Sequence, residues 1–133
     1  MKRIILSFIL SLFVTLSYAQ SQRYYCEIKG IQKALSSGLK IVFDFGENPI
    51  YTAWGGLTSK QKLVDEKGEE IQFNSMVDAG NYLSSKGWIL QQAYSSVYGD
   101  NFIVHWIFYK DADNPQEAIK GIVTKEQYKR ENK

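Results

Sequence analysis

The hydrophobic pattern of the chain changes sharply after its first nineteen residues. A short basic start (MKR) is followed by an apolar run, broken only by Ser and Thr, from Ile4 to Leu16. Small residues at Ser17 and Ala19 then stand where a signal peptidase reads the chain. This three-part pattern predicts a secretory signal peptide over 1–19, cleaved after Ala19, because the run is too short and wrongly flanked for a spanning helix. An uncleaved amino-terminal anchor is the alternative.

Alternation of hydrophobic and polar positions in the remaining chain predicts strands before and after one helix. Two early strands are expected over 23–32 and 39–45, two short ones over 62–65 and 70–73, and a hairpin over 88–98 and 102–110. A three-residue hairpin loop, 99–101, would set Tyr94 opposite Trp106 and gather the aromatic side chains under the helix. A two-residue loop would shift this register by one. The other face, which holds Ile103 and Ile107, is too apolar to be fully solvated, so we expect something to cover it.

The helix is the best-defined element, and its signals are local. It should begin after Asn74 or Ser75 and end at Gly87, with Trp88 placed to contact Leu83 as in a Schellman motif. Its apolar stripe contains Gly80, which costs about 1 kcal/mol against Ala. We therefore expect a close approach of helix and sheet at Gly80. Cap residues also predict short helical segments after 114 and after 124.

Together these elements predict one α+β domain over 20–133. It would be a small antiparallel sheet of about five to six strands packed against one main helix, with short C-terminal helical segments. The ordered core should span about 23–110, followed by a helical or irregular tail over 111–133.

Charge and cysteine content exclude several classes. Cleavage would remove two of the 16 basic residues, leaving 14 against 14 acidic ones. A formally neutral chain argues against nucleic-acid binding and against electrostatic docking on anionic lipid, and no stable membrane insertion is expected after cleavage. The single cysteine, Cys26, cannot form an internal disulfide. A buried, inert thiol is the favoured interpretation, and a bridge to another chain is the alternative.

One set of short motifs looks familiar. The segment 73–83 (FNSMVDAGNYL) is followed by Gly87-Trp88, Ala93-Tyr94 and His105-Trp106, and preceded by Tyr25-Cys26-Glu27 and Asp44-Phe45-Gly46. Over most of the mature chain this pattern resembles a family of small exported proteins of Bacteroides-type gut bacteria, of unknown function. The resemblance implies a compact α+β domain in the cell envelope or outside the cell, and no chemistry. A larger aliphatic residue would be expected where this chain has Gly80.

Candidates for a site are few. Aromatic residues make up 14% of the chain, which suits either a β-rich core or a surface for sugars and proteins. Trp54, in an irregular glycine-flanked segment, is the best ligand-binding candidate, together with Tyr51 and Tyr98. The lone His105 would need an acid such as Asp44 or Asp78 and a nucleophile such as Ser95 to be catalytic. A hydrogen-bonded, half-buried His is the simpler interpretation. The sequence contains no recognisable metal or cofactor motif, so none is expected.

These observations favour an exported, non-enzymatic binding or interaction module, periplasmic or secreted, whose partner is another envelope protein or a glycan. A small hydrolase using His105 with a carboxylate is one rival, and a structural subunit that forms homo-oligomers through the Ile103 and Ile107 face is another. A carboxylate within reach of His105 would favour the hydrolase. An exposed cluster of Trp54, Tyr51 and Tyr98 would favour binding.

Overall fold

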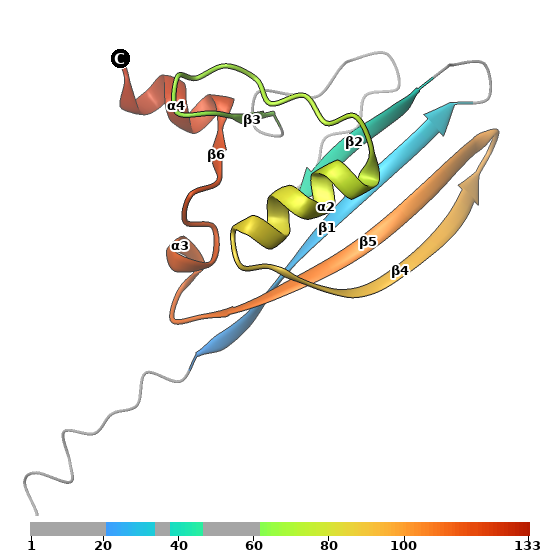
Figure 1. Ribbon diagram of the computed structural model, residues 1–133, viewed down its shortest axis with the longest axis horizontal. Coiled ribbons are helices and arrows are strands. Elements are labelled where there is room, and N and C mark those ends of the chain that lie inside the picture. The colour runs from blue at the N-terminus through green and yellow to red at the C-terminus, as the bar shows by residue number, and fades with distance from the viewer. Residues whose placement is uncertain (1–20, 34–37, 47–61) are drawn as a thin grey trace, which may run out of the picture.

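The computed structural model describes residues 21–33, 38–46 and 62–133. It is a mixed α+β structure with an antiparallel four-stranded sheet, three helices and a second, two-stranded sheet (Figure 1). The elements are β1 (Gln22–Lys33), β2 (Leu39–Asp44), β3 (Leu63–Val64), α2 (Met76–Ser85), β4 (Ile89–Tyr98), β5 (Asn101–Ala112), α3 (Pro115–Ala118), β6 (Val123–Thr124) and α4 (Lys125–Glu131).

The strand order of the main sheet is β2-β1-β5-β4. Strand β1 pairs with β2 on one side and with β5 along its full length on the other, so the two longest strands form the centre. The expectation of one sheet of five to six strands is wrong. Strand β3 pairs with β6 in a separate small sheet, and of the strand expected over 70–73 only Glu70 forms a bridge, to Val64.

The predicted ends of α2 are confirmed. Ser75 caps the helix by accepting a hydrogen bond from the Asp78 N–H at 3.1 Å. At the other end the Trp88 N–H donates to the Leu83 carbonyl, the Gly87 N–H donates to the Ser84 carbonyl, and Gly87 has a φ of +84°. These two bonds define a Schellman motif, which only a residue tolerant of positive φ closes without strain. The short helices expected after 114 and 124 are also present, as α3 and α4.

The core lies on the face of the sheet that α2 crosses (Figure 1). Its buried cluster combines helix and strand residues: Cys26, Ile28, Ile41, Phe43, Leu63, Met76, Ala79, Leu83, Trp88, Phe108, Ala118 and Ile122. A Cβ added at Gly80 would lie 2.9 Å from Cζ3 of Trp106, closer than carbon atoms pack. The expected close approach of helix and sheet at Gly80 is therefore confirmed.

The hairpin register differs from the expected one. The loop has two residues, because Tyr98 pairs with Asn101, and Tyr94 lies opposite His105 rather than Trp106. A β-bulge between Leu90 and Gln92 then shifts the pairing by one residue, so that Leu90 lies opposite Phe108. As a result Tyr94 lies on the face of the sheet opposite to the helix, and it is not part of the aromatic cluster expected under the helix.

Candidate functional site

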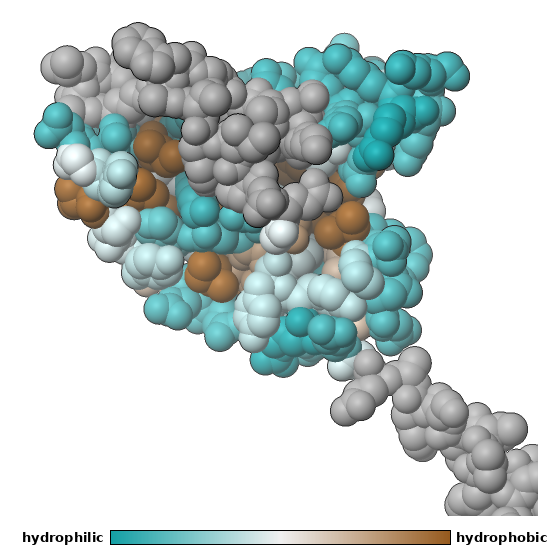
Figure 2. Space-filling view, turned by 180° about the vertical axis from the view of Figure 1, so that it is seen from behind, coloured by the Kyte–Doolittle hydropathy of each residue, from teal (hydrophilic) through white to brown (hydrophobic). Residues whose placement is uncertain are grey.

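We use the term back face for the side of the main sheet turned away from α2. Residues that alternate with the core positions of each strand point to this side, among them Glu27, Lys29, Asp44, Ser96 and His105. Seen from this side, hydrophobic residues reach the surface in several separate patches between hydrophilic ones (Figure 2). The back face is therefore chemically mixed, with a polar group of side chains at its centre.

His105 is held between a carboxylate and a hydroxyl. Its Nδ1 lies 2.6 Å from Oε1 of Glu27 on β1, and its Nε2 lies 2.8 Å from Oγ of Ser96 on β4. A carboxylate can only accept, so Nδ1 carries the proton and donates it to Glu27. In the neutral imidazole Nε2 is then the acceptor, and the Ser96 hydroxyl donates to it. The ring of Tyr94 stacks on the imidazole with centroids 4.5 Å apart.

The polar chain continues across the sheet from Glu27. The Lys29 ammonium lies 3.0 Å from Oε2 of Glu27 and 3.4 Å from Oδ2 of Asp44 on β2. The other oxygen of Asp44 accepts the Gly46 N–H at 2.9 Å. The side chains of Glu27, Lys29 and Asp44 are each about one-fifth exposed or less, and that of His105 is 12% exposed. One continuous, half-buried network thus joins all four strands, with the Lys29 ammonium between the two carboxylates.

The structure brings together only part of the predicted hydrolase set. Asp44 belongs to the same network as His105, but Lys29 and Glu27 stand between them. Ser95 pairs with Val104, so the hydroxyl that reaches His105 is that of Ser96. Asp78 caps α2 and takes no part in the network. Glu27 itself was missed, although its alternation with Cys26 and Ile28 marks it as a polar residue of the back face.

The aromatic candidates can be judged only in part. Tyr51 and Trp54 lie outside the described residues. Tyr98 is 79% exposed, on the last residue of β4.

Strand β4 is an exposed edge. It has a neighbour, β5, on one side only among the described strands, and every residue of β4 except Ser96 is exposed. Its exposed large apolar side chains are Ile89, Leu90, Tyr94, Val97 and Tyr98. No residue of this strand (ILQQAYSSVY) is charged and none is proline. Natural edge strands usually carry such residues to prevent pairing with other chains.

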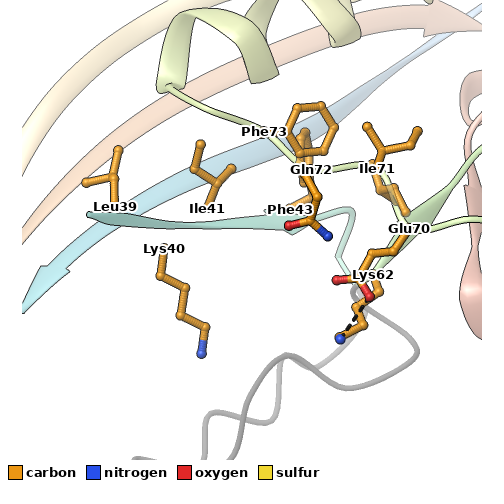
Figure 3. A pocket seen from close by; sticks show the side chains of 10 residues that line it. Leu39, Lys40, Ile41, Phe43, Lys62, Glu70, Ile71, Gln72 and Phe73 are labelled. Atoms are coloured by element: carbon orange, nitrogen blue, oxygen red, sulfur yellow. Dashed lines mark hydrogen bonds and ion pairs between the residues drawn. The ribbon is translucent and has the colours of Figure 1, made fainter. Parts of the chain in front are cut away.

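A cavity of about 190 Å³ opens between β2 and the segment that follows β3 (Figure 3). Apolar side chains such as Ile41, Phe43 and Phe73 line one part of it, and the ion pair of Lys62 with Glu70, 3.0 Å apart, lies at another. The charged partner Lys62 holds the pKa of Glu70 below its usual value. The volume is below that of typical small-molecule pockets, which start near 300 Å³.

Cys26 is 2% exposed on the helix-covered side of β1. Burial raises the pKa of its thiol far above the usual value, so the thiolate is disfavoured. This agrees with the predicted inert thiol, and a bridge to another chain would require the core to open.

No cluster of three or more potential metal ligands occurs within the described part of the chain, and no helix in that part is long and apolar enough to cross a membrane. No family model matches the chain, and no curated protein or solved structure is detectably similar to it. Its function is therefore inferred from the arrangement of its own residues.

Proposed function

We propose that the mature chain is an exported protein-interaction module of the cell envelope, and that its working form is a pair of copies joined along β4. The observation that carries this proposal is the exposed, uncharged ten-residue edge. An unpaired edge offers a row of backbone N–H and C=O groups to another strand. On β4 that row is flanked by apolar side chains on both faces of the sheet.

The hairpin geometry determines which backbone groups point outward. Residues that flank a two-residue loop, here Tyr98 and Asn101, exchange both backbone hydrogen bonds in an antiparallel hairpin. The backbone N–H and C=O groups of every second residue of β4 then point away from β5. Ser95 and Val97 accordingly direct their backbone groups to the free edge of β4.

A second copy of the chain fits this edge. Beyond the bulge, the regular stretch 92–98 can pair with itself in an antiparallel manner about Ser95, as a two-fold interface requires. Gln92 then lies opposite Tyr98, Ala93 opposite Val97, and Tyr94 opposite Ser96, and both members of each pair lie on the same face. None of these pairs sets two charges against each other. The resulting sheet would be continuous through both copies, with Tyr94 next to the two-fold axis and Tyr98 at the end of the paired stretch.

The mass of the mature protein in solution tests the pairing. Analytical ultracentrifugation of protein lacking residues 1–19 should show a dimer that dissociates on dilution. Ser95→Lys should give a monomer, because two lysines would face each other across the axis. Mixing Ser95→Lys with Ser95→Glu should restore a dimer. Val77→Lys is the matched control, because Val77 is 59% exposed but lies on α2.

Two outcomes would overturn the pairing. One is a wild-type protein that sediments as a monomer up to millimolar concentration. The other is a dimer that Ser95→Lys leaves intact, which would place the interface elsewhere, for example at Ile103 and Ile107. A monomer that retains a different envelope protein or a glycan would indicate that the exposed tyrosines of the back face serve that partner directly.

Export rests on the leader pattern and is tested separately. Intact-mass analysis of the protein recovered from outside the cytoplasm should give a chain that begins at Gln20. A mature species that retains Met1 would contradict cleavage and favour an amino-terminal anchor.

A further inference from the structure

We propose that Ser96 is an activated nucleophile, and that Ser96, His105 and Glu27 form a triad that accepts acyl groups from small neutral esters. This inference does not rest on the pairing of two copies, because it concerns side chains of one chain. It is carried by two short contacts in series, 2.8 Å from Ser96 Oγ to His105 Nε2 and 2.6 Å from His105 Nδ1 to Glu27 Oε1.

The direction of the hydrogen bonds is the one that nucleophilic catalysis requires. Because Glu27 fixes the proton on Nδ1, the lone pair of Nε2 is directed at the serine hydroxyl. A hydroxyl within about 2.6–3.2 Å of a base, with that base oriented by an acid on its other side, is the recognised signature of an activated nucleophile.

Neighbouring side chains hold the triad in place. Lys29, 3.0 Å from Glu27, compensates the carboxylate charge and fixes its second oxygen. The stacked ring of Tyr94 restricts the plane of the imidazole. Glu27, Lys29 and Tyr94 are therefore positioning residues, whereas Ser96 and His105 would touch the reacting atoms.

The surroundings of Ser96 indicate the class of substrate. Tyr94 and Tyr98 flank it at alternate positions of β4, with 45% and 79% of their surface exposed, and Ile103 lies directly opposite on β5. A shallow aromatic and aliphatic surface suits a short apolar or aromatic acyl group. A surface this shallow favours small esters over a buried, extended substrate.

The reaction balances without a cofactor. The Ser96 oxygen attacks the ester carbonyl carbon while its proton passes to Nε2 of His105. The tetrahedral intermediate collapses, the C–O bond to the leaving group breaks, and the imidazolium returns the proton to the departing alcohol. Water then attacks the acyl-serine carbonyl while His105 takes its proton. The bond from the acyl group to the Ser96 oxygen breaks, His105 returns the proton to that oxygen, and a carboxylic acid is released.

A fluorophosphonate probe tests the nucleophile directly. The serine oxygen forms a bond to phosphorus and fluoride leaves, so intact mass should show one added phosphonyl group, mapped by peptide analysis to Ser96. Ser96→Ala should abolish the label, and so should His105→Gln. Ser84→Ala is the control, because Ser84 is an exposed serine on α2 and not on the back face, and it should label like the wild type.

The positioning role of Glu27 needs a readout that a purely structural role would not move. Glu27→Gln should lower the labelling rate by at least about tenfold, since loss of the orienting acid in a triad lowers rates strongly. The dependence of that rate on pH should also shift, because the charge beside His105 has changed. Circular dichroism should establish that each variant is folded.

Absence of labelling in folded wild-type protein would overturn the proposal, as would labelling that persists in Ser96→Ala. If Ser96 is labelled but Glu27→Gln changes neither the rate nor its pH profile, Glu27 is not part of the triad and the assignment fails for that residue. Release of p-nitrophenol from p-nitrophenyl butyrate should follow the same order among the variants.

Discussion

Single side chains determine much of the stability of the helix-covered face, and Trp88 is the clearest case. It is 2% exposed, follows the Schellman turn, and packs edge-on against Phe45 with ring centroids 5.7 Å apart. Trp88→Ala should lower the free energy of unfolding by roughly 3–5 kcal/mol, as for other large core aromatics. Chemical denaturation measures this, and a loss below about 1 kcal/mol would contradict the packing.

Trp88→Phe provides the matched comparison. The indole Nε1 is buried with no acceptor in the described part of the chain. An unsatisfied buried donor costs roughly 1–3 kcal/mol, so its removal should offset part of the lost volume. We expect Trp88→Phe to destabilise the protein clearly less than Trp88→Ala.

The reactivity of Cys26 is also decided at the residue scale. Because burial disfavours the thiolate, which is the reactive form, the native protein should not react with iodoacetamide or Ellman's reagent. One thiol should react rapidly after denaturation in guanidinium chloride. Rapid reaction under native conditions would show that this part of the core opens readily.

The contact between α2 and the sheet gives a prediction at the scale of the element. In an exposed helix, Gly→Ala stabilises by about 1 kcal/mol. At Gly80 the added methyl group would lie 2.9 Å from the Trp106 ring, so Gly80→Ala should destabilise the protein by roughly 1–3 kcal/mol. Ser84→Ala, at an exposed position of the same helix, should be neutral or slightly stabilising. Thermal melts of both variants make the comparison, and a gain in stability for Gly80→Ala would refute the close approach.

The elements that the sequence could predict are those whose signals are local. The caps of α2, its Gly87 stop and the two short C-terminal helices depend on neighbours within a few residues, and all were predicted. The hairpin register was not, because one extra loop residue reverses every side chain and the bulge at Gln91 partly reverses them again. The Glu27–His105 contact joins β1 to β5, and no periodicity in either strand identifies its partner in space.

At the scale of the whole molecule, ion pairs between distant segments should make stability depend on pH. Lys62 lowers the pKa of Glu70, and Arg23 lowers that of Asp111. A carboxyl group whose pKa is lowered by folding stabilises the folded state above its unfolded pKa, about 4, and loses this contribution as the pH falls further. Stability should therefore decline below about pH 4.

Glu70→Gln isolates one part of this effect. At neutral pH it should lower the free energy of unfolding by about 0.2–1 kcal/mol, the usual value for partly exposed pairs, and the difference from wild type should vanish in acid. Glu66→Gln, in the exposed turn that precedes Glu70, should show no such convergence. Parallel denaturation curves at pH 7 and pH 3 measure both variants. A difference between Glu70→Gln and wild type that is the same at the two pH values would contradict the linkage.

The long pairing of β1 with β5 also constrains when the protein can fold. The Arg23–Asp111 contact at one end of that pairing joins residues 88 positions apart. Bringing such distant segments together costs loop entropy before any contact forms, whereas α2 and the β4–β5 hairpin need only nearby residues. A chain threaded outward from its amino terminus presents β1 first and its central partner almost last. If the proposed leader exports the chain, β1 has only β2 to pair with until nearly all of the chain has crossed, and a product truncated before β5 should remain unfolded.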